Sequence, residues 1–196
     1  MHHILVYLLS YLIGSIPSAF LMTRLFKKVD IRREGSGNVG GMNTYSVAGL
    51  LPGVITIILD ILKGTAAVLI AGYLSGPSYS IFIAGILAVL GHNYSIFLNF
   101  KGGKGLATTA GVFLALSPAS IVYAIICAVA LTLILRDTNT AFGIAALSIP
   151  IILAFQFGSA DWIVFGAAMA LIVAFKHLPD FRSYKNGRRK VLPEKR

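Results

Sequence analysis

Long apolar stretches separated by short polar segments dominate the first half of the chain. Residues 2–21, 50–74 and 79–97 each form such a stretch. A helix that crosses the hydrocarbon of a bilayer needs about 20 residues, and all three stretches are close to that length. The pattern therefore predicts three transmembrane helices. The absence of a cleavage site after residues 2–21 argues against a removable signal peptide.

The second half adds four shorter apolar segments. Residues 105–135 are interrupted at Ser117-Pro118, and proline lacks a backbone donor and disfavours helix at the residue before it. We therefore expect two short helices there, followed by helices at 141–157 and 162–176. The prediction is an all-α integral membrane protein with seven transmembrane helices, forming one domain over 1–180 and a basic tail at 181–196.

The composition agrees with a membrane protein. Hydrophobic residues make up 57% of the chain and charged residues 12%, and the mean hydropathy is +0.82. In soluble domains, about 45–50% of residues are apolar and about 25% are charged. The net charge is +10, but too little polar surface remains for a nucleic-acid-binding patch, so we expect no nucleic-acid partner. A single cysteine, Cys127, excludes an internal disulfide and a cysteine zinc site. We expect no metal and no cofactor.

The basic residues are concentrated in four places. Sixteen of the seventeen lie at 24–33, at Lys101 and Lys104, at Arg136, and at 176–196. Cytoplasmic loops near membrane spans collect Lys and Arg. Seven spans put all four clusters on one side, whereas one long helix over 105–135 would separate Arg136 from the tail. This predicts an outside N-terminus and a cytoplasmic C-terminus. We expect anionic lipid headgroups around the tail, whose basic residues include Arg182, Lys185, Arg188, Arg189 and Lys190.

A first glycine-rich loop covers residues 34–43. It contains the spacing of a dinucleotide fingerprint, but that fingerprint needs a βαβ unit, and here an apolar helix follows. Glycines free to adopt positive φ can form a concavity of N–H groups that suits an anion. A flexible connector is the alternative. The candidate binding residues are Gly35, Ser36, Gly37, Asn38, Gly40 and Asn43.

A second glycine-rich loop leads directly into the fourth expected helix. Its glycines, lysines and helix N-terminus together favour a phosphate. It is not a Walker A motif, because Leu98 and Gly105 stand where glycine and Ser or Thr are required. A basic turn at the lipid headgroups is the alternative. The candidate binding residues are Lys101, Gly102, Gly103, Lys104, Gly105 and Thr108.

Four further residues have chemistry that is unusual for a membrane helix. His92 and His177 lie near the cytoplasmic ends of their helices and could face the same space, although an interfacial histidine is more often structural. Asp60 and Lys63 lie inside the second span at i,i+3 spacing. They indicate either a structural salt bridge or a group on a substrate pathway.

These motifs together resemble the bacterial acyl phosphate:glycerol-3-phosphate acyltransferases, the PlsY family, over nearly the full length. The first loop with Asn43 is similar to the family's first motif. Gly91-His92 followed by residues 100–108 is similar to its second motif. Residues 59–64 look like its second helix, and His177 matches the histidine of its third motif.

This chain departs from the family pattern at several positions. Met42 replaces a usual threonine, and Ser46 replaces an arginine that is implied in holding substrate phosphate. In the third motif Asp180 replaces an asparagine and Ser183 a further arginine. A carboxylate at 180 would repel a phosphate unless it is protonated or turned away.

The resemblance implies transfer of a fatty acyl group from acyl phosphate to glycerol 3-phosphate, giving lysophosphatidate. It implies catalytic roles for Ser36, His177 and Lys104. The remaining loop candidates, His92 and Asp180 are implied in substrate binding. Direct attack by the substrate hydroxyl is preferred over an acyl-enzyme on Ser36, with His177 or a substrate phosphate taking the proton. Positioning and charge neutralisation would supply much of the rate acceleration.

Two other functions remain open from the sequence. A diverged relative could bind lipid or phosphate without acyl transfer, or use another polyol phosphate, as Met42, Ser46 and Asp180 suggest. A transporter is disfavoured because the charged loops fall on one face and no inverted repeat is evident. The resemblance implies a multi-pass protein of a bacterial inner membrane, surrounded by membrane lipids. The sequence does not indicate an oligomeric state.

Overall fold

The computed structural model describes residues 2–75 and 79–187, and over these residues it contains helices and no strand. The chain divides into two compact units, Met1–Leu116 and Ser117–Arg196. The all-α prediction is confirmed for the described residues. Arg188, Arg189 and Lys190 of the expected basic tail lie outside them.

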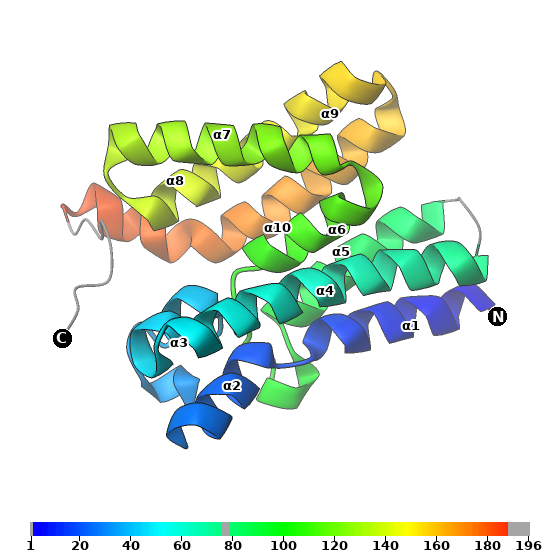
Figure 1. Ribbon diagram of the computed structural model, residues 1–196. Helices are drawn as coiled ribbons and strands as arrows, with labels where there is room; N and C mark the ends of the chain where they lie inside the picture. The colour runs from blue at the N-terminus through cyan, green and yellow to red at the C-terminus, as the bar shows by residue number, and fades with distance from the viewer. Residues whose placement is uncertain (1, 76–78, 188–196) are drawn as a thin grey trace. The chain divides into compact units, whose positions relative to one another are not determined.

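The first unit is organised around one long helix, α4. This helix packs against α1, α5 and α6, and α1 also runs along α5. The short elements α2, η1 and α3 gather at one end of the unit (Figure 1). Its elements are α1 (His2–Ser15), α2 (Ser18–Lys27), η1 (Ile31–Arg33), α3 (Gly41–Ala48), α4 (Leu50–Ser75), α5 (Tyr79–Asn93), η2 (Ile96–Leu98) and α6 (Leu106–Leu116).

The single span predicted at residues 2–21 is found as one apolar segment, His3–Lys27, but two helices form it. Helix α1 ends at Ser15 and α2 begins at Ser18. Pro17 lies between them and has no N–H to donate to a preceding carbonyl. The apolar path continues through both helices to Lys27. The break leaves backbone carbonyls near Pro17 in need of another donor.

Glycine allows the helices of the first unit to approach closely. Gly14 and Gly91 lie where α1 crosses α5, and Gly64 and Gly111 lie where α4 crosses α6. A Cβ atom at any of the four would collide with the backbone of the facing helix. Small residues at such crossings provide van der Waals packing where lipid supplies little hydrophobic driving force between helices.

The second unit contains α7 (Pro118–Leu135), α8 (Thr138–Ala145), η3 (Ala146–Ser148), α9 (Ile149–Phe157) and α10 (Ala160–Lys185). The span predicted at 141–157 is found at Thr138–Phe157, but α8, η3 and α9 form it in place of one continuous helix. A short 3₁₀ segment precedes α9, and Pro150 occupies the first turn of α9, where its missing N–H costs little. Helix α10 continues beyond the expected end at residue 176, and the expected domain boundary at residue 180 falls inside it.

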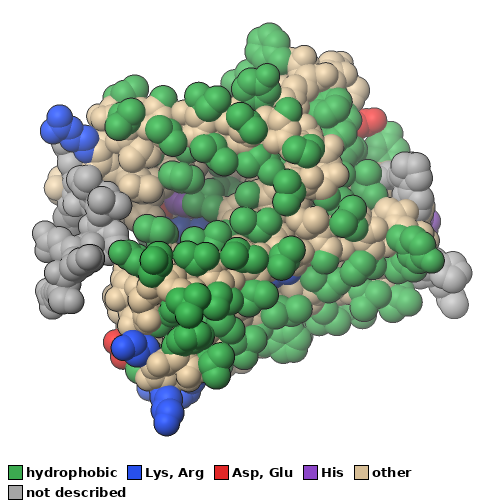
Figure 2. Space-filling model, in the orientation of Figure 1, with side chains coloured by type: hydrophobic (Ala, Val, Ile, Leu, Met, Phe, Trp, Pro, Cys, Tyr) green, Lys and Arg blue, Asp and Glu red, His purple; other side chains and the backbone are tan. Residues whose placement is uncertain are grey.

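Within the described residues, six helical segments are long and apolar enough to cross a membrane. Helix α6 has 11 residues, fewer than the ~20 that a perpendicular crossing needs. It ends at Leu116 and α7 begins at Pro118, which confirms the predicted break at Ser117-Pro118. Hydrophobic side chains cover much of the visible sides of α1 and α4, whereas Lys and Arg side chains gather near the end of α2 (Figure 2).

Candidate functional site

The first glycine loop is held by the buried side chain of Asn43. Its Oδ1 accepts a hydrogen bond from the N–H of Ser36 at 2.9 Å. Its Nδ2 lies 3.0 Å from the carbonyl oxygens of Glu34 and Asn38 and 3.3 Å from that of Ile31. The sequence indicated Asn43 as a substrate-binding residue, but its polar atoms face the backbone of the loop. Asn43 therefore determines the shape of the loop.

Two glycines give this loop its path. Gly35 and Gly37 have φ values of +56° and +71°, which L-residues with a side chain rarely adopt. Ser36 between them is exposed, and its Oγ accepts a hydrogen bond from the N–H of Asn38 at 3.4 Å. The accessible polar side chains of the loop are therefore those of Glu34, Ser36 and the half-buried Asn38.

A surface ion pair precedes this loop. Nη2 of Arg32 lies 2.6 Å from Oδ2 of Asp30, and Oδ1 of Asp30 accepts from the N–H of Arg32 at the start of η1. The side-chain hydrogen bond from Arg32 lowers the pKa of Asp30 to about 2. Nη1 of Arg32 also donates to the carbonyl of Leu98 on η2 at 3.5 Å. Arg32 thus connects the segment before the first loop with the segment before the second.

The second glycine loop is attached to the end of α5 through its own N–H groups. Gly102 donates to the carbonyl of Asn93 at 3.2 Å, and Gly103 donates to that of His92 at 3.1 Å. The N–H of Phe100 donates to the carbonyl of Ser95 at 2.8 Å. The sequence led us to expect these glycine N–H groups to face an anion. In the structure they hold the loop in place.

Apart from Lys101, the positive groups of this loop lie after Gly102 and Gly103. Lys104 is half-buried and comes just before Gly105, which has a φ of +85°. The carbonyl of Gly105 accepts from the N–H of Thr109, so the first N–H groups of α6 lack intrahelical partners. The side chain of Thr108, expected in substrate binding, is buried, and its carbonyl lies against Gly64 of α4. Lys101 is exposed.

The two glycine loops meet at Gly103. A Cβ at this position would collide with the carbonyl oxygen of Val39 and with Nε2 of His92, so both groups lie directly against the loop. Val39 is buried with Leu98, Ile31 and Ala19 in a small apolar cluster beneath the loops. The structure thus brings the two motifs together at one end of the first unit.

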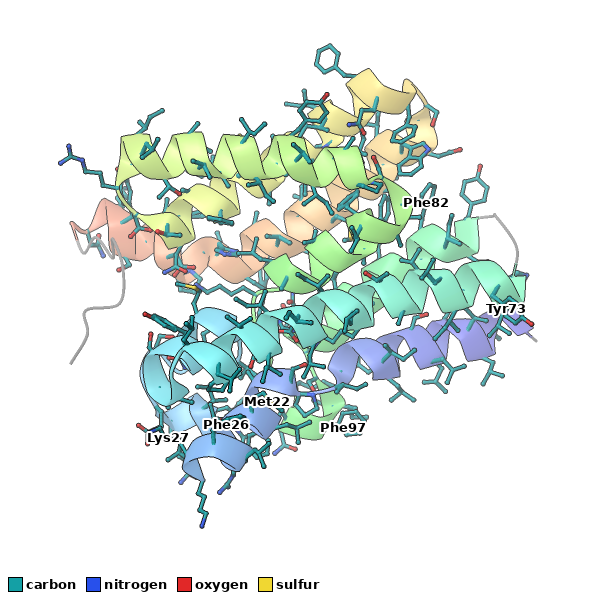
Figure 3. The ribbon with its side chains drawn as sticks, in the orientation of Figure 1. Met22, Phe26, Lys27, Tyr73, Phe82 and Phe97 are labelled. Carbon is teal, nitrogen blue, oxygen red and sulfur yellow. The ribbon has the colours of Figure 1, made fainter. Side chains whose placement is uncertain are left out.

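Aromatic side chains are exposed beside this end. Phe26 is 43% exposed on α2, and Phe97 is 58% exposed on η2. Figure 3 shows Phe26 and Lys27 on α2 and Phe97 on η2. Aromatic and basic side chains together are typical of the boundary between hydrocarbon and lipid headgroups.

Beneath the second loop lies a buried polar group formed by Asp60, Lys63 and His92. Oδ1 of Asp60 is 2.8 Å from Nζ of Lys63 and 3.6 Å from Nδ1 of His92. Nζ of Lys63 also donates to the carbonyl of Ile16 at 2.9 Å, which supplies a donor at the break before Pro17. The three side chains line a small cavity together with Ser15, Ser18 and Ser95. His92 therefore lies beneath the loop, in contrast to the substrate-facing place that the sequence indicated.

The exposed face of α3 lacks a cation. Met42 is 51% exposed, and Ser46, one turn further, is also exposed. Oγ of Ser46 donates to the carbonyl of Met42 at 3.1 Å. The family resemblance implies an arginine at position 46, so this face carries less positive charge than the family pattern would give it.

In the second unit, His177 is fully buried on α10. Its Nδ1 is 2.9 Å from the carbonyl of Val173. A carbonyl can only accept, so Nδ1 of His177 carries a proton. Gly143 of α8 makes room for the ring, because a Cβ there would meet Cβ and Cγ of His177 at 2.8 and 2.9 Å. Asp180, one turn further, is half-buried.

Comparison with known proteins defines the family. A sequence model described as glycerol-3-phosphate acyltransferase matches residues 4–187. The chain belongs to this family. The match extends through both units and includes both glycine loops and His177.

Individual relatives match over nearly the whole chain. Glycerol-3-phosphate acyltransferase 2 of Moorella thermoacetica is 36% identical over 192 residues, which cover 98% of each protein. Glycerol-3-phosphate acyltransferase of Geotalea daltonii is 40% identical over 182 residues, or 93% of each.

Solved structures share the fold. The glycerol 3-phosphate form of PlsY (YgiH), an integral membrane glycerol 3-phosphate acyltransferase, aligns with a TM-score of 0.88 at 31% identity, covering 96% of this chain and 94% of that one. Its lysophosphatidic acid form gives 0.87 at 29% identity with the same coverage. Together with its apolar helices, this likeness makes the chain a multi-pass, all-helical membrane protein.

The pairing of His92 with Asp60 and the role of Val39 were missed at the sequence level. The i,i+3 spacing in the sequence pairs Asp60 only with Lys63, its neighbour along the same helix. The residue type of Val39 does not indicate its role, because its contact with Gly103 is made by its backbone carbonyl. Asp60 did carry a signal, because a second possible partner for an intramembrane carboxylate could have been sought among the histidines.

Proposed function

We propose that this chain transfers a fatty acyl group from acyl phosphate to glycerol 3-phosphate, forming lysophosphatidate and inorganic phosphate. The observation that carries the proposal is the meeting of the two glycine loops at Gly103 in a chain that matches the family over residues 4–187. Such a meeting point would bring two phosphate groups close together at the boundary between lipid and water.

Each loop binds one of the two substrate phosphates. The acyl phosphate headgroup binds at residues 102–105, where Lys104 and the N-terminus of α6 provide positive charge. Glycerol 3-phosphate binds through the accessible side chains of Ser36 and Asn38, with Lys104 between the two groups. Gly35, Gly37, Gly40 and Asn43 contribute by shaping the first loop. Gly102, Gly103 and His92 contribute by fixing the second, and Lys101 attracts substrate from its edge.

The chemical step needs one nucleophile and one proton acceptor. The sn-1 hydroxyl oxygen of glycerol 3-phosphate attacks the acyl carbonyl carbon and forms the ester bond. The bond from that carbon to the phosphate oxygen breaks, and inorganic phosphate leaves with the electron pair. The hydrogen-bond partner of the Ser36 hydroxyl is an N–H donor, which cannot accept a proton from it. This supports direct attack by the substrate hydroxyl over an acyl-enzyme on Ser36.

The proton of that hydroxyl goes to a substrate phosphate or to His177. Because Nδ1 of His177 donates to the carbonyl of Val173, Nε2 is the ring nitrogen that would take the proton from a neutral side chain. Asp180 and the neighbouring Ser183 remain expected modifiers of phosphate binding. The role of His177 stays a prediction, which a His177→Asn variant with unchanged kcat would refute.

The proposal includes a membrane topology. With α6 counted as a short seventh span, the loop at Lys104 and the turn at Arg136 lie on one side, because α6 and α7 together cross twice. The N-terminus is then outside, and the C-terminus and both glycine loops are cytoplasmic. Bacterial relatives support a bacterial inner membrane.

The activity is tested with purified protein, acyl phosphate and radiolabelled glycerol 3-phosphate, with acyl-CoA as the control donor. We expect labelled lysophosphatidate from acyl phosphate alone. Lys104→Ala and Ser36→Ala should each lower kcat/KM by about 100-fold or more, the effect of removing a donor to developing charge. Lys27→Ala, which removes a charge from the exposed end of α2 (Figure 3), should leave activity unchanged. Full turnover by Ser36→Ala would refute its assignment.

A second candidate function is favoured by the exposed face of α3. Because Met42 and Ser46 offer no charge there, the site could accept a different polyol phosphate or bind phosphate without transferring an acyl group. The same assay with alternative polyol phosphates distinguishes these cases. Retained phosphate binding without any acylated product would support the diverged binder.

A further inference from the structure

The second glycine loop has little order of its own. Three glycines between residues 102 and 105 give its backbone wide conformational freedom, which must be lost when a substrate phosphate is bound. Something beneath the loop must therefore hold it in advance. Two residues of α5 contact the loop there: Asn93, whose carbonyl accepts the N–H of Gly102, and His92, whose ring also lies against Gly103.

His92 touches the loop through both its backbone and its ring. Its carbonyl oxygen accepts the N–H of Gly103 at 3.1 Å. Its ring presents Nε2 to Gly103 so closely that no Cβ could be added there. The orientation of this ring therefore sets the position of Gly103, and with it the start of the segment that carries Lys104.

Asp60 of α4 orients the opposite side of the same ring. Its Oδ1 lies 3.6 Å from Nδ1 of His92, and both side chains are buried. A carboxylate beside one ring nitrogen favours the ring orientation that keeps this nitrogen near it, as carboxylates do behind histidines that bind metals. Asp60 also pairs with Lys63 at 2.8 Å, so its negative charge is compensated within the membrane.

We infer that Asp60 is a positioning residue for the phosphate-binding loop, acting through His92, and that it does more than neutralise Lys63. A continuous series of contacts runs from the carbonyl of Ile16 through Lys63, Asp60 and His92 to Gly103. The expected kinetic effect rests on the proposed acyl transfer. The positioning of the loop by Asp60 and His92 does not depend on that proposed function.

The decisive comparison is between two variants. Asp60→Asn leaves Lys63 as an uncompensated buried charge and removes the carboxylate beside His92. The double variant Asp60→Asn with Lys63→Met removes both charges, and neutral replacement of a buried pair is usually tolerated. If neutralisation were the only role of Asp60, the double variant would recover every property that the single variant loses.

We expect the double variant to recover thermal stability but not loop function. Its KM for acyl phosphate should stay raised by about tenfold, because the segment that carries Lys104 is then held less firmly. The KM for glycerol 3-phosphate should change less, because Ser36 and Asn38 lie on the first loop, which Asn43 holds. Ser10→Ala, which removes a buried hydroxyl bonded to the carbonyl of Val6 within α1, is the matched control and should leave both KM values unchanged.

Hydrogen exchange provides a readout independent of activity. Amides at residues 101–106 should exchange faster in the double variant than in wild type or Ser10→Ala, while those at 34–41 should not. Recovery of both KM and amide protection in the double variant would overturn the inference. If wild type lacks acyltransferase activity, the proposed function fails and exchange alone decides the inference. If Asp60→Asn does not fold, the double variant still decides it.

Discussion

At the residue scale, buried side chains supply the order that the glycine loops lack. Asn43 arranges the first loop through contacts with four backbone groups, and His92 supports the second through Gly103. In both cases the residue that looks chemically interesting in the sequence acts on the backbone. The accessible functional groups are Ser36, Asn38 and Lys104.

At Ser46, one substitution can restore the arginine that the family resemblance implies at this position. Ser46→Arg would place a guanidinium on the exposed face of α3, where it can reach a substrate phosphate without displacing a buried group. We expect the KM for glycerol 3-phosphate to fall by about tenfold, because an arginine–phosphate pair is a charge-assisted hydrogen bond.

Steady-state kinetics at fixed acyl phosphate measure this effect, with Ser46→Gln as the uncharged control. Equal KM values for the Arg and Gln variants would show that position 46 does not face the acceptor phosphate. A fall in KM confined to another polyol phosphate would favour the second candidate function.

At the element scale, glycine contacts set the distances between the helices that carry the loops. The α4–α6 crossing at Gly64 and Gly111 fixes the helix whose N-terminus follows the second loop. The α1–α5 crossing at Gly14 and Gly91 fixes the helix that ends at His92 and Asn93. The site is therefore sensitive to changes in helix packing some distance away from it.

Gly14→Ala should destabilise the first unit by about 1–3 kcal/mol, the usual cost of overpacking, because its Cβ would collide with the backbone of Ala88. Gly72→Ala is the matched control on α4, because its Cβ would meet only Ile81 at an ordinary 3.8 Å. This control should be neutral or gain up to about 1 kcal/mol of helix propensity. Thermal melts followed by circular dichroism compare the two, and equal melting temperatures would contradict the packing argument.

At the scale of the whole molecule, the topology depends on whether the short helix α6 crosses the bilayer. Six helical segments are long enough by themselves, and six crossings would put Arg136 outside. Seven crossings keep it with the other basic clusters. The distribution of Lys and Arg favours seven.

Cysteine labelling in intact cells decides between these topologies. In a Cys127→Ala background, Arg136→Cys should resist a membrane-impermeant thiol reagent added outside, whereas Ser159→Cys should react. Lys27→Cys is the internal control and should resist the reagent. Labelling of Arg136→Cys without labelling of Ser159→Cys would show that α6 does not cross.

Much of the element structure could be read from the sequence. The break at Ser117-Pro118 was predicted correctly because proline acts locally on its own backbone. The same argument applied to Pro17 and was not used, since the apolar pattern continues through it to Lys27. The 3₁₀ segment before Ile149 lies in continuous apolar sequence, so hydropathy alone could not reveal it.

The sequence by itself determined the membrane character, the all-helical class, the family and the two glycine loops. The length of apolar stretches, the positions of charges and the spacing of motifs are local properties, so they can be identified without knowledge of the fold. Only the tertiary structure decided that the N–H groups of Gly102 and Gly103 bind α5, that Asn43 faces its own loop, and that His92 lies between Asp60 and Gly103. These outcomes depend on which groups packing brings within a few ångströms of each other across different helices, and no pattern along a single helix contains that information.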